Sequence, residues 1–479
     1  MLNFLTFILS LTATFNALEG ILLNREQLAK WYPQFNTTNQ IDLTYKEITS
    51  ISVDTFVGLS NLQILTLSQN EIIQIESVTF KDLKNIQELR LDHNQINPTI
   101  QSSTFTNLTS LELISLSYNQ ISYLDGLTFS GLTNLKYLFI DNNQLVNISS
   151  LLFLGLVNLE RLDLWSNKIR ALQAGTFNYL PRLLSLYLNQ NELTCLNSTM
   201  LVGLPNLLDL ILFSNKLSNI EEYTFNWIPN LKMLILSNNY ITGLNQSTFA
   251  GLSNLQQLLI ANNKLTSIDQ ANFSMLTSLE NLDMSENSLT QINENQFFGM
   301  ANLLQLALNQ NNILNLDSHA FNGLNSLQFL SLANNNLSNL NDLTFATLPS
   351  LSVLILFYNN LVNLSMHKIF SNLNQLEILL LDHNGILNLT SFGYIMPKLA
   401  QLDIGFNQMT ILDQGIFNGL SGIKELRLND NLLYYIDSSV FKGMVTLESV
   451  YLGKNIISKL QPDYVKKLCS LNPKCHIYI

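Results

Sequence analysis

Apolar and polar residues recur along this chain with a period of 24 residues. From Leu111 the sequence reads LELISLSYNQISYLDGLTFSGLTN, and from Leu231 it reads LKMLILSNNYITGLNQSTFAGLSN. Both segments fit one unit, LxxLxLxxNxIxxLxxxTFxGLxx, whose places we number from the first leucine. Apolar residues at the fourth and sixth places are separated by a single residue, a period of two that predicts one short strand in each turn. Stacking the turns would pair these strands into one parallel sheet.

The asparagine at the ninth place sets the register of the whole chain. It occurs seventeen times with a mean spacing close to 24 residues, at Asn70, Asn94, Asn119, Asn143, Asn167, Asn191, Asn215, Asn239, Asn263, Asn287, Asn311, Asn335, Asn359, Asn384, Asn407, Asn431 and Asn455. Upstream, IDLTYKEI from Ile41 to Ile48 adds one degenerate turn with Lys46 at the ninth place, which makes 18 turns. We expect the asparagines to satisfy backbone groups of neighbouring turns where the chain bends.

A phenylalanine follows ten residues after most of these asparagines. Fifteen of the 26 phenylalanines belong to this row: Phe56, Phe80, Phe105, Phe129, Phe153, Phe177, Phe225, Phe249, Phe273, Phe297, Phe321, Phe345, Phe370, Phe417 and Phe441. We expect them to stack as a spine on the convex side, each burying about 150–250 Å². Because no single turn can bury its own apolar face, neighbouring turns supply the core, which predicts a curved solenoid.

The repeats resemble the leucine-rich repeat family, in particular its typical 24-residue extracellular subclass. The resemblance covers about residues 41–460 and rests on the unit above with its ninth-place asparagine. It implies an α/β solenoid, a horseshoe with one parallel concave sheet and a largely irregular convex side. The family includes adhesion proteins, matrix proteins, immune receptor ectodomains and non-catalytic subunits of secreted enzymes, so the fold does not choose among these functions.

The two ends of the chain differ from the repeats. Residues 1–17 contain an apolar run too short to span a membrane, which predicts a signal peptide, with a buried cap segment as the alternative. Residues 18–40 are expected to form an N-terminal cap without cysteines. In it, these apolar residues would cover the first turn: Ile21, Leu22, Leu28, Trp31, Tyr32 and Phe35.

Cysteines occur at three positions of the chain. In the expected C-terminal cap, residues 461–479, Cys469 and Cys475 lie six residues apart, so a local disulfide is predicted and two buried thiols are the alternative. Cys195 is left over at a place that should face outward. We expect it to be a free thiol, with intermolecular pairing as the other possibility.

Composition narrows the function classes. Only 12% of the residues are charged against 47% hydrophobic, the net charge is −11, and no basic run occurs, so a nucleic-acid partner is not expected. No later stretch is apolar for about 18 residues, so no membrane anchor is expected in the mature chain. Nine Asn-x-Ser/Thr sequons favour a secreted, glycosylated product: Asn36, Asn107, Asn147, Asn197, Asn245, Asn272, Asn336, Asn363 and Asn388.

The polar residues show no motif of catalysis. The string Leu-Asp-His-Asn occurs twice, at 91–94 and 381–384, but Asp and His are adjacent in each and are expected to point in different directions as rim residues. No cysteine and histidine set has metal-ligand spacing, and no nucleophile elbow or phosphate loop is present. We therefore expect no enzyme activity, no metal and no cofactor.

Aromatic residues at the third, fifth, seventh and eighth places would lie on the concave face, where the core does not need them. A first cluster on turns five to nine mixes aromatic side chains with Arg and Asp, and a second lies on turns thirteen to fifteen around Phe329, Val353, Ile355 and Leu380. The candidate ligand-binding residues of the two clusters are Tyr137, Phe139, Arg161, Asp163, Trp165, Tyr187, Ile211, Phe213, Phe357 and Tyr358. The alternative is that a charge-poor repeat tolerates aromatic residues on its strands.

These observations predict a secreted, extracellular protein that mediates protein–protein recognition or adhesion through its concave face. The ligand is expected to be a protein. Two other functions stay open: a non-catalytic accessory subunit of a secreted enzyme, and a cytoplasmic repeat scaffold.

Overall fold

The computed structural model describes residues 20–268, 273–393, 396–437, 439–457 and 475–479. The chain forms two units, one of residues 1–193 with 199–207 and the other of residues 194–198 with 208–479, which we call the first and the second unit. The predicted signal peptide, residues 1–17, lies outside the described residues. The boundaries expected for the two caps stay predictions.

The first unit begins with β1 (Ile21–Leu23) and α2 (Arg25–Trp31). The Asn24 side chain caps α2 by accepting a hydrogen bond from the Gln27 N–H, and Leu28 is buried. β1 pairs in parallel with β3 (Ile48–Ile51). Among the apolar residues expected to cover the first turn, Leu22 is 51% exposed because β1 turns alternate side chains outward.

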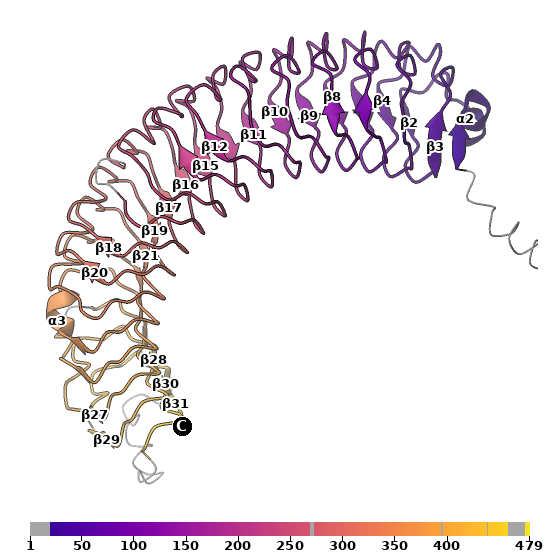
Figure 1. The fold of residues 1–479 in the computed structure, drawn as a ribbon. Coiled ribbons are helices and arrows are strands. Elements are labelled where there is room, and N and C mark those ends of the chain that lie inside the picture. Colours follow the sequence, from indigo (N-terminus) through magenta and orange to yellow (C-terminus); the bar gives the residue numbers. More distant parts are fainter. Residues whose placement is uncertain (1–19, 269–272, 394–395, 438, 458–474) are drawn as a thin grey trace, which may run out of the picture. The chain divides into compact units, whose positions relative to one another are not determined.

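The main sheet of the first unit has one three-residue strand per turn. These strands are β2 (Gln40–Asp42), β4 (Ile64–Thr66), β5 (Glu88–Arg90), β7 (Leu113–Ser115), β9 (Tyr137–Phe139), β10 (Arg161–Asp163) and β11 (Ser185–Tyr187). Each pairs in parallel and in register with the next (Figure 1). A second, shorter ladder joins β6 (Thr99–Ile100) to β8 (Tyr123–Leu124).

The second unit continues the same pattern. Its main strands are β13 (Asp209–Ile211), β15 (Met233–Ile235), β16 (Gln257–Leu259), β17 (Asn281–Asp283), β19 (Gln305–Ala307), β21 (Phe329–Ser331), β22 (Val353–Ile355), β24 (Ile378–Leu380), β26 (Gln401–Asp403), β28 (Glu425–Arg427), β30 (Ser449–Tyr451) and β31 (His476–Tyr478). Two-residue strands pair beside them: β12 (Cys195–Leu196) with β14 (Asn219–Ile220), β18 (Gln291–Ile292) with β20 (Asn315–Leu316), β23 (Asn363–Leu364) with β25 (Asn388–Leu389), and β27 (Ile411–Leu412) with β29 (Tyr435–Ile436). One short helix, α3 (Met366–Ile369), interrupts a loop. The predicted fold class, a parallel-sheet leucine-rich solenoid with a largely irregular side opposite the strands, is confirmed.

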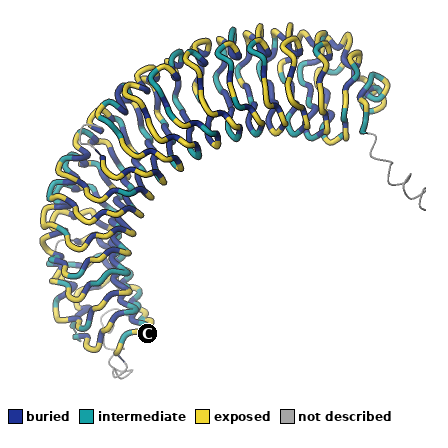
Figure 2. The backbone as a smooth tube through the Cα atoms, viewed as in Figure 1, coloured by how far each residue is buried: buried dark blue, intermediate teal, exposed yellow. Residues whose placement is uncertain are grey.

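The core lies inside each turn. Leucines such as Leu162 and Leu164, at the fourth and sixth places of one turn, are fully buried, and buried and exposed residues alternate turn after turn (Figure 2). The ninth-place asparagines close the turns as expected. The Asn94 Nδ2 donates to the carbonyl oxygens of Leu67 and Leu91 at 3.0 and 3.1 Å, and its Oδ1 accepts from the Ile72 N–H at 3.0 Å. Each such side chain satisfies backbone groups that water cannot reach.

The phenylalanine spine is also confirmed. In the first unit, Phe56 and Phe80 stack with ring centroids 6.0 Å apart, and in the second unit Phe225 and Phe249 stack at 6.4 Å. The spine contains one member that the spacing missed. Phe392 follows its asparagine by eight residues instead of ten, yet it is fully buried and lies 6.1 Å from Phe417. The turn from Asn384 to Asn407 has 23 residues, one fewer than the usual 24, which accounts for one of the two places.

In every turn, the residue directly before the ninth place has a left-handed backbone. These residues have φ between 50° and 58°: Tyr45, Gln69, His93, Tyr118, Asn142, Ser166, Gln190, Ser214, Asn238, Asn262, Glu286, Gln310, Asn334, Tyr358, His383, Phe406, Asp430 and Lys454. None is Val, Ile or Thr, which is the expected exclusion because β-branched side chains fit this conformation poorly. The eighth place therefore breaks the strand geometry and re-aims its side chain.

Candidate functional site

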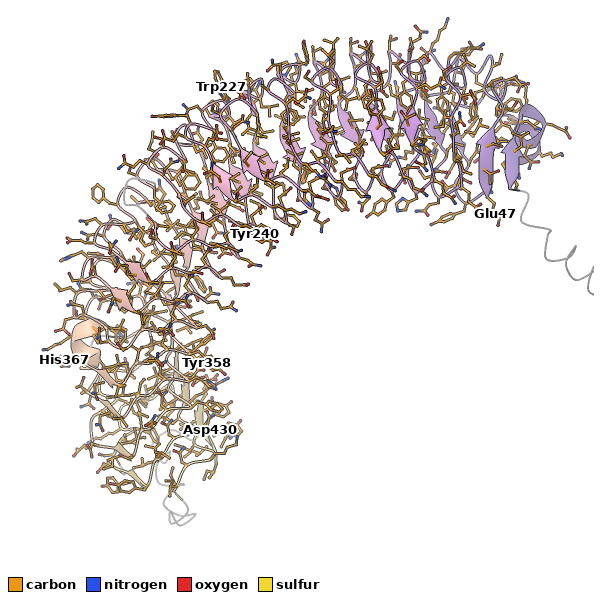
Figure 3. All side chains as sticks on the ribbon, viewed as in Figure 1. Glu47, Trp227, Tyr240, Tyr358, His367 and Asp430 are labelled. Carbon is orange, nitrogen blue, oxygen red and sulfur yellow. The ribbon has the colours of Figure 1, made fainter. Side chains whose placement is uncertain are left out.

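The outward side chains of the main strands and the turns after them form a surface that we call the strand face. It consists of the third, fifth, seventh and eighth places of each turn. In the second unit, Tyr358 and Asp430 lie on this side, whereas Trp227 and His367 lie on the opposite, loop side (Figure 3). The strand face carries ten predicted site residues, which the two units place in separate groups.

In the first unit, Arg161 is the centre of the predicted cluster. Its guanidinium carbon lies 5.6 Å from the ring centroid of Phe139 and 4.5 Å from that of Tyr187, on the two neighbouring strands. Its Nε and Nη2 each donate to one carboxylate oxygen of Asp163, at 2.9 Å. The guanidinium is thus held by two rings and a bidentate carboxylate, a geometry that suits arginine and not lysine.

The Asp163 carboxylate is only 5% exposed. Burial raises the pKa of Asp163 above its ordinary value, and the hydrogen bonds from Arg161 counter part of that rise. The hydrogen bond to Asp163 in turn raises the pKa of the Arg161 guanidinium. Asp163 therefore acts by holding Arg161 in place and offers little surface to a ligand.

Aromatic side chains extend this cluster along the first unit. Trp165 meets Tyr118 edge to face at a centroid distance of 6.3 Å, and Tyr118 stacks on His93 at 4.2 Å. Tyr118 is 44% exposed and Tyr137, on β9, is 37% exposed. The sequence-based prediction missed Tyr118 and His93; their signal was an aromatic residue at the eighth place of adjacent turns.

In the second unit, three rings form a column at the eighth place of consecutive turns. Tyr358 stacks on His383 at 4.1 Å, and His383 stacks on Phe406 at 4.1 Å, with ring planes within 23° of parallel. Phe357 meets Tyr358 edge to face at 5.8 Å. Tyr358 and Phe406 are 50% and 41% exposed. The predicted pair Phe357 and Tyr358 is thus one end of a larger aromatic surface.

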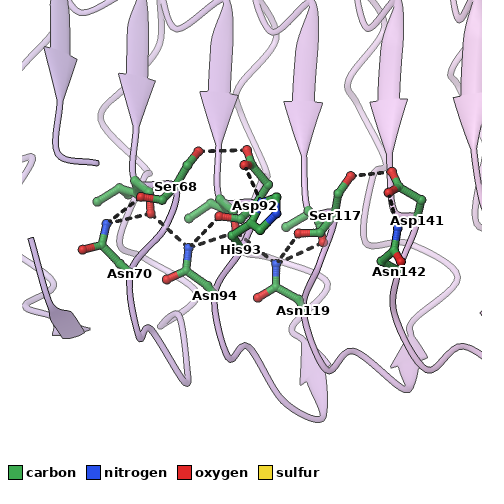
Figure 4. A network of polar contacts seen from close by, with 12 residues as sticks. Ser68, Asn70, Asp92, His93, Asn94, Ser117, Asn119, Asp141 and Asn142 are labelled. Atoms are coloured by element: carbon green, nitrogen blue, oxygen red, sulfur yellow. Dashed lines mark hydrogen bonds and ion pairs between the residues drawn. The ribbon is translucent and has the colours of Figure 1, made fainter. Parts of the chain in front are cut away.

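The expectation that Asp and His point in different directions in the two Leu-Asp-His-Asn strings is wrong. Asp and His contact each other in both: the Asp92 Oδ2 lies 3.2 Å from the His93 Nδ1, and the Asp382 Oδ2 lies 2.8 Å from the His383 Nδ1. The reason is the left-handed backbone of the histidine, which ends the alternation of a strand. In the first unit, Asp92 also accepts a hydrogen bond from Ser68, and similar contacts follow along the ladder (Figure 4).

Charges on the strand face are mostly acidic. Its 18 turns carry four basic residues, and each is paired with an acid of the same face: Arg90 with Glu88, Arg161 with Asp163, Arg427 with Glu425, and Lys454 with Asp430. Twelve acidic residues occupy the same places: Asp42, Glu88, Asp92, Asp141, Asp163, Asp209, Asp283, Glu286, Asp382, Asp403, Glu425 and Asp430. The face is therefore more acidic than the chain as a whole, which has 35 acids and 24 bases.

Asp403 has the most perturbed environment of these acids. Its pKa is raised from 3.8 to about 6, mainly by burial and in smaller part by the neighbouring Asp382. The Gly405 N–H donates to one carboxylate oxygen at 2.9 Å, while the Arg427 Nη1 lies 3.8 Å from the other. This carboxylate is buried with less compensation than Asp163 has.

The remaining predicted residues lie as follows. Phe213 is half-buried on the strand face of the second unit, but Ile211 is only 6% exposed, so it offers almost no contact area. Cys195, the first residue of β12, is a half-buried free thiol. Cys469 lies outside the described residues, so its pairing with Cys475 stays a prediction.

The sequons lie outside the main strands, and most of those described are exposed. Asn272 is outside the described residues. Asn197 and Asn245 are half-buried, and six side chains are open to solvent: Asn36, Asn107, Asn147, Asn336, Asn363 and Asn388.

The second unit also has hollows away from the aromatic clusters. Two hollows of the second unit have volumes of about 390 and 420 Å³, and neither is lined by a predicted site residue. No group of three or more His, Cys, Asp or Glu side chains in that part is arranged to hold a metal ion. Within the same residues, no helix has the length and apolar character needed to cross a bilayer.

Comparison with known proteins identifies the repeats. A model described as leucine rich repeat matches residues 37–96, 99–145, 157–217 and 397–457. A model described as BspA type leucine rich repeat region matches residues 203–327 and 242–377. No curated protein matches the chain.

Solved structures share the fold. A leucine-rich repeat protein of Leptospira interrogans is 25% identical with a TM-score of 0.65, covering 94% of this chain and 98% of its own. A chain of the Drosophila Toll–Spatzle complex is 20% identical with a TM-score of 0.73; the match covers 95% of this chain but 59% of that one. An internalin of Listeria monocytogenes is 27% identical with a TM-score of 0.50, covering 65% and 84%. With the repeat models matching from residue 37 to residue 457, the chain belongs to the leucine-rich repeat family.

Proposed function

We propose that this protein recognises another protein through its strand face. The observation that carries the proposal is a set of mutually ordered aromatic side chains on that face that the core does not require. Tyr118, Tyr358 and Phe406 are exposed, and Trp165 and His383 are half-buried. Rings held by stacking lose little conformational freedom on binding, so they suit a contact surface. The similarity to a chain of the Toll–Spatzle complex fits a binding role.

A library of random dodecapeptides displayed on phage, selected on the immobilised protein, tests this proposal. We expect selected peptides to lose about tenfold or more in affinity for Trp165→Ala or for Tyr358→Ala, because truncating a central aromatic residue has effects of this size. Affinities are measured by fluorescence polarisation of the synthetic peptides.

Trp227→Ala is the matched control. Trp227 is 50% exposed on the loop side, where its Nε1 donates to the Ser198 carbonyl oxygen at 2.8 Å. Selected peptides should bind this variant as tightly as the parent protein. Undiminished binding to both strand-face variants, or an equal loss with Trp227→Ala, would overturn the proposal.

We further propose that the protein is secreted and glycosylated, and that it acts as a binding protein without catalysis. The exposed sequons support the first part. Intact mass of the protein from expressing cells and their medium, before and after deglycosylation, tests it. A glycosylated species in the medium is expected; an unglycosylated species found only inside the cells would favour the cytoplasmic scaffold instead.

A further inference from the structure

The strand face of the second unit combines exposed rings with an undercompensated carboxylate in three consecutive turns. We propose that the column of Tyr358, His383 and Phe406, with Asp403 beside it, binds an arginine-bearing segment of a partner protein. This inference rests on the proposed function and specifies the partner's chemistry.

The rings provide the first half of the site. His383 covers one face of Tyr358 and one face of Phe406, and both end rings keep large exposed areas. A planar guanidinium stacks well on such rings and is attracted by their negative faces. The Asp382 carboxylate, hydrogen-bonded to His383, keeps negative potential beside the column.

Asp403 provides the second half. It lies on β26, three residues before Phe406, and its side chain is 13% exposed. Gly405 at the seventh place adds no side chain over this carboxylate: a Cβ there would lie 3.1 Å from the Asp403 Oδ1 and 3.2 Å from the Asn429 Oδ1. A cation that arrives at this carboxylate would offset the cost of its burial.

The protein itself shows that this face holds arginine. Arg161 in the first unit lies between two rings with a bidentate carboxylate, and Arg427 in the second unit lies 5.3 Å from the ring centroid of Tyr451 while paired with Glu425. All basic residues of the face are paired with its own acids, and the acids outnumber them. Charge complementarity therefore requires a basic partner.

The phage-selected peptides whose binding is lost in Tyr358→Ala test this inference. We expect arginine in these peptides to be enriched by about threefold or more over the unselected library. Exchange of the critical arginine for citrulline, which keeps the planar shape and removes the charge, should weaken binding by about tenfold. Asp403→Asn should weaken it by about fivefold or more.

Asp283→Asn is the matched control, because Asp283 occupies the same fifth place on β17 and accepts a hydrogen bond from the Ser285 N–H as Asp403 does from Gly405. Its effect should stay within about twofold. Equal affinity of the citrulline peptide, or an equal loss in Asp283→Asn, would overturn the inference while leaving the proposed function intact. If no selected peptide depends on any residue of the strand face, the proposed function itself fails.

Discussion

Asp163 in the first unit and Asp403 in the second occupy the same fifth place of their turns but have different surroundings. Both carboxylates are largely buried, and burial raises the pKa of both. Asp163 receives two hydrogen bonds from Arg161, whereas Asp403 receives one from the Gly405 N–H and has Arg427 only at 3.8 Å. Two carboxylates at the same place of the repeat are thus both largely buried, and the neighbouring turns determine how well each charge is compensated.

Among variants that test this comparison, Arg161→Ala should cause the largest loss of stability. The variant leaves Asp163 buried without its bidentate partner, which should cost about 2 kcal/mol after allowing for the partial exposure of Arg161. Thermal unfolding followed by circular dichroism at pH 7 measures the loss.

Arg427→Ala is the counterpart in the second unit. Its closer partner Glu425 is 29% exposed and can be hydrated, and its contact with Asp403 is long, at 3.8 Å, so we expect a smaller loss, below about 1 kcal/mol. An equal loss in the two variants would mean that the buried Asp163 does not set the cost. The double variant Arg161→Ala with Asp163→Asn should recover part of the stability, because it removes the unpaired charge.

A smaller effect is expected from Asp403→Asn, and it depends on pH. The pKa of Asp403 in the folded protein, about 6, lies above the unfolded value of 3.8, so the folded state favours the protonated form. Stability from this group is highest below pH 3.8 and falls as the pH rises through 6. The asparagine variant should therefore be more stable than the parent at pH 7, by about 1 kcal/mol, with the difference disappearing near pH 4.

Melting temperatures of the parent and the variant at pH 4, 5, 6 and 7 check this expectation. Asp283→Asn serves again as the control at the same place of the repeat. A constant difference between parent and Asp403→Asn across this pH range would contradict a buried ionised carboxylate as the cause. The gain in stability would come with the loss of arginine binding proposed above, a common relation between functional sites and stability.

The smallest expected effect concerns the backbone of the ring column. Tyr358 has φ 51°, so Tyr358→Ile should be less stable than Tyr358→Leu, although the two side chains have the same composition. The difference should be about 0.5–1 kcal/mol because β-branching is disfavoured in the left-handed region. Urea unfolding of both variants measures it.

Phe329, at the third place on β21, gives the control for this pair. In a strand, Ile is favoured over Leu, so the order should reverse for Phe329→Ile and Phe329→Leu. The same order at both places would show that backbone conformation is not the source.

Much of the fold could be predicted from the sequence because the residues that make each contact recur at the same place in many turns. The ninth-place asparagines and fifteen spine phenylalanines were found from spacing alone, since a solenoid places equal positions of neighbouring turns side by side. Phe392 was missed because it lies two places early in a turn that is one residue short, and counting residues from the asparagine cannot follow such a shift.

The candidate site was less predictable because it depends on geometry between turns. The eighth place was treated as part of a strand, so the Asp–His contacts at His93 and His383 were not expected. The arginine pairs did have a signal: opposite charges two residues apart on one strand point to the same side, as in Arg161 and Asp163. The burial of Ile211 had no signal in the sequence, because an apolar residue fits both an exposed and a covered place on a strand.

The hydrogen bonds of the ninth-place asparagines run in one direction along the chain. Asn94 bonds to Leu67 and Ile72 of the preceding turn, and Asn70 likewise bonds to Leu43 and Ile48. Between turns, the asparagine side chain thus satisfies buried backbone groups of the turn made before it, while the bond of Asn94 to Leu91 stays within its own turn. During synthesis from the N-terminus, the newest turn therefore lacks these asparagine hydrogen bonds until the next turn has been made.

The first turn, where Lys46 replaces asparagine, has no earlier repeat to serve. The Lys46 Nζ instead lies 5.7 Å from the Trp31 ring centroid. A deletion of turns from the C-terminal end removes the asparagine that bonds to the last remaining turn, whereas a deletion from the other end removes main-chain acceptors such as the Asn39 carbonyl oxygen, which accepts from the Gln63 N–H. The repeat array therefore has a direction, and shortening it at one end is not equivalent to shortening it at the other.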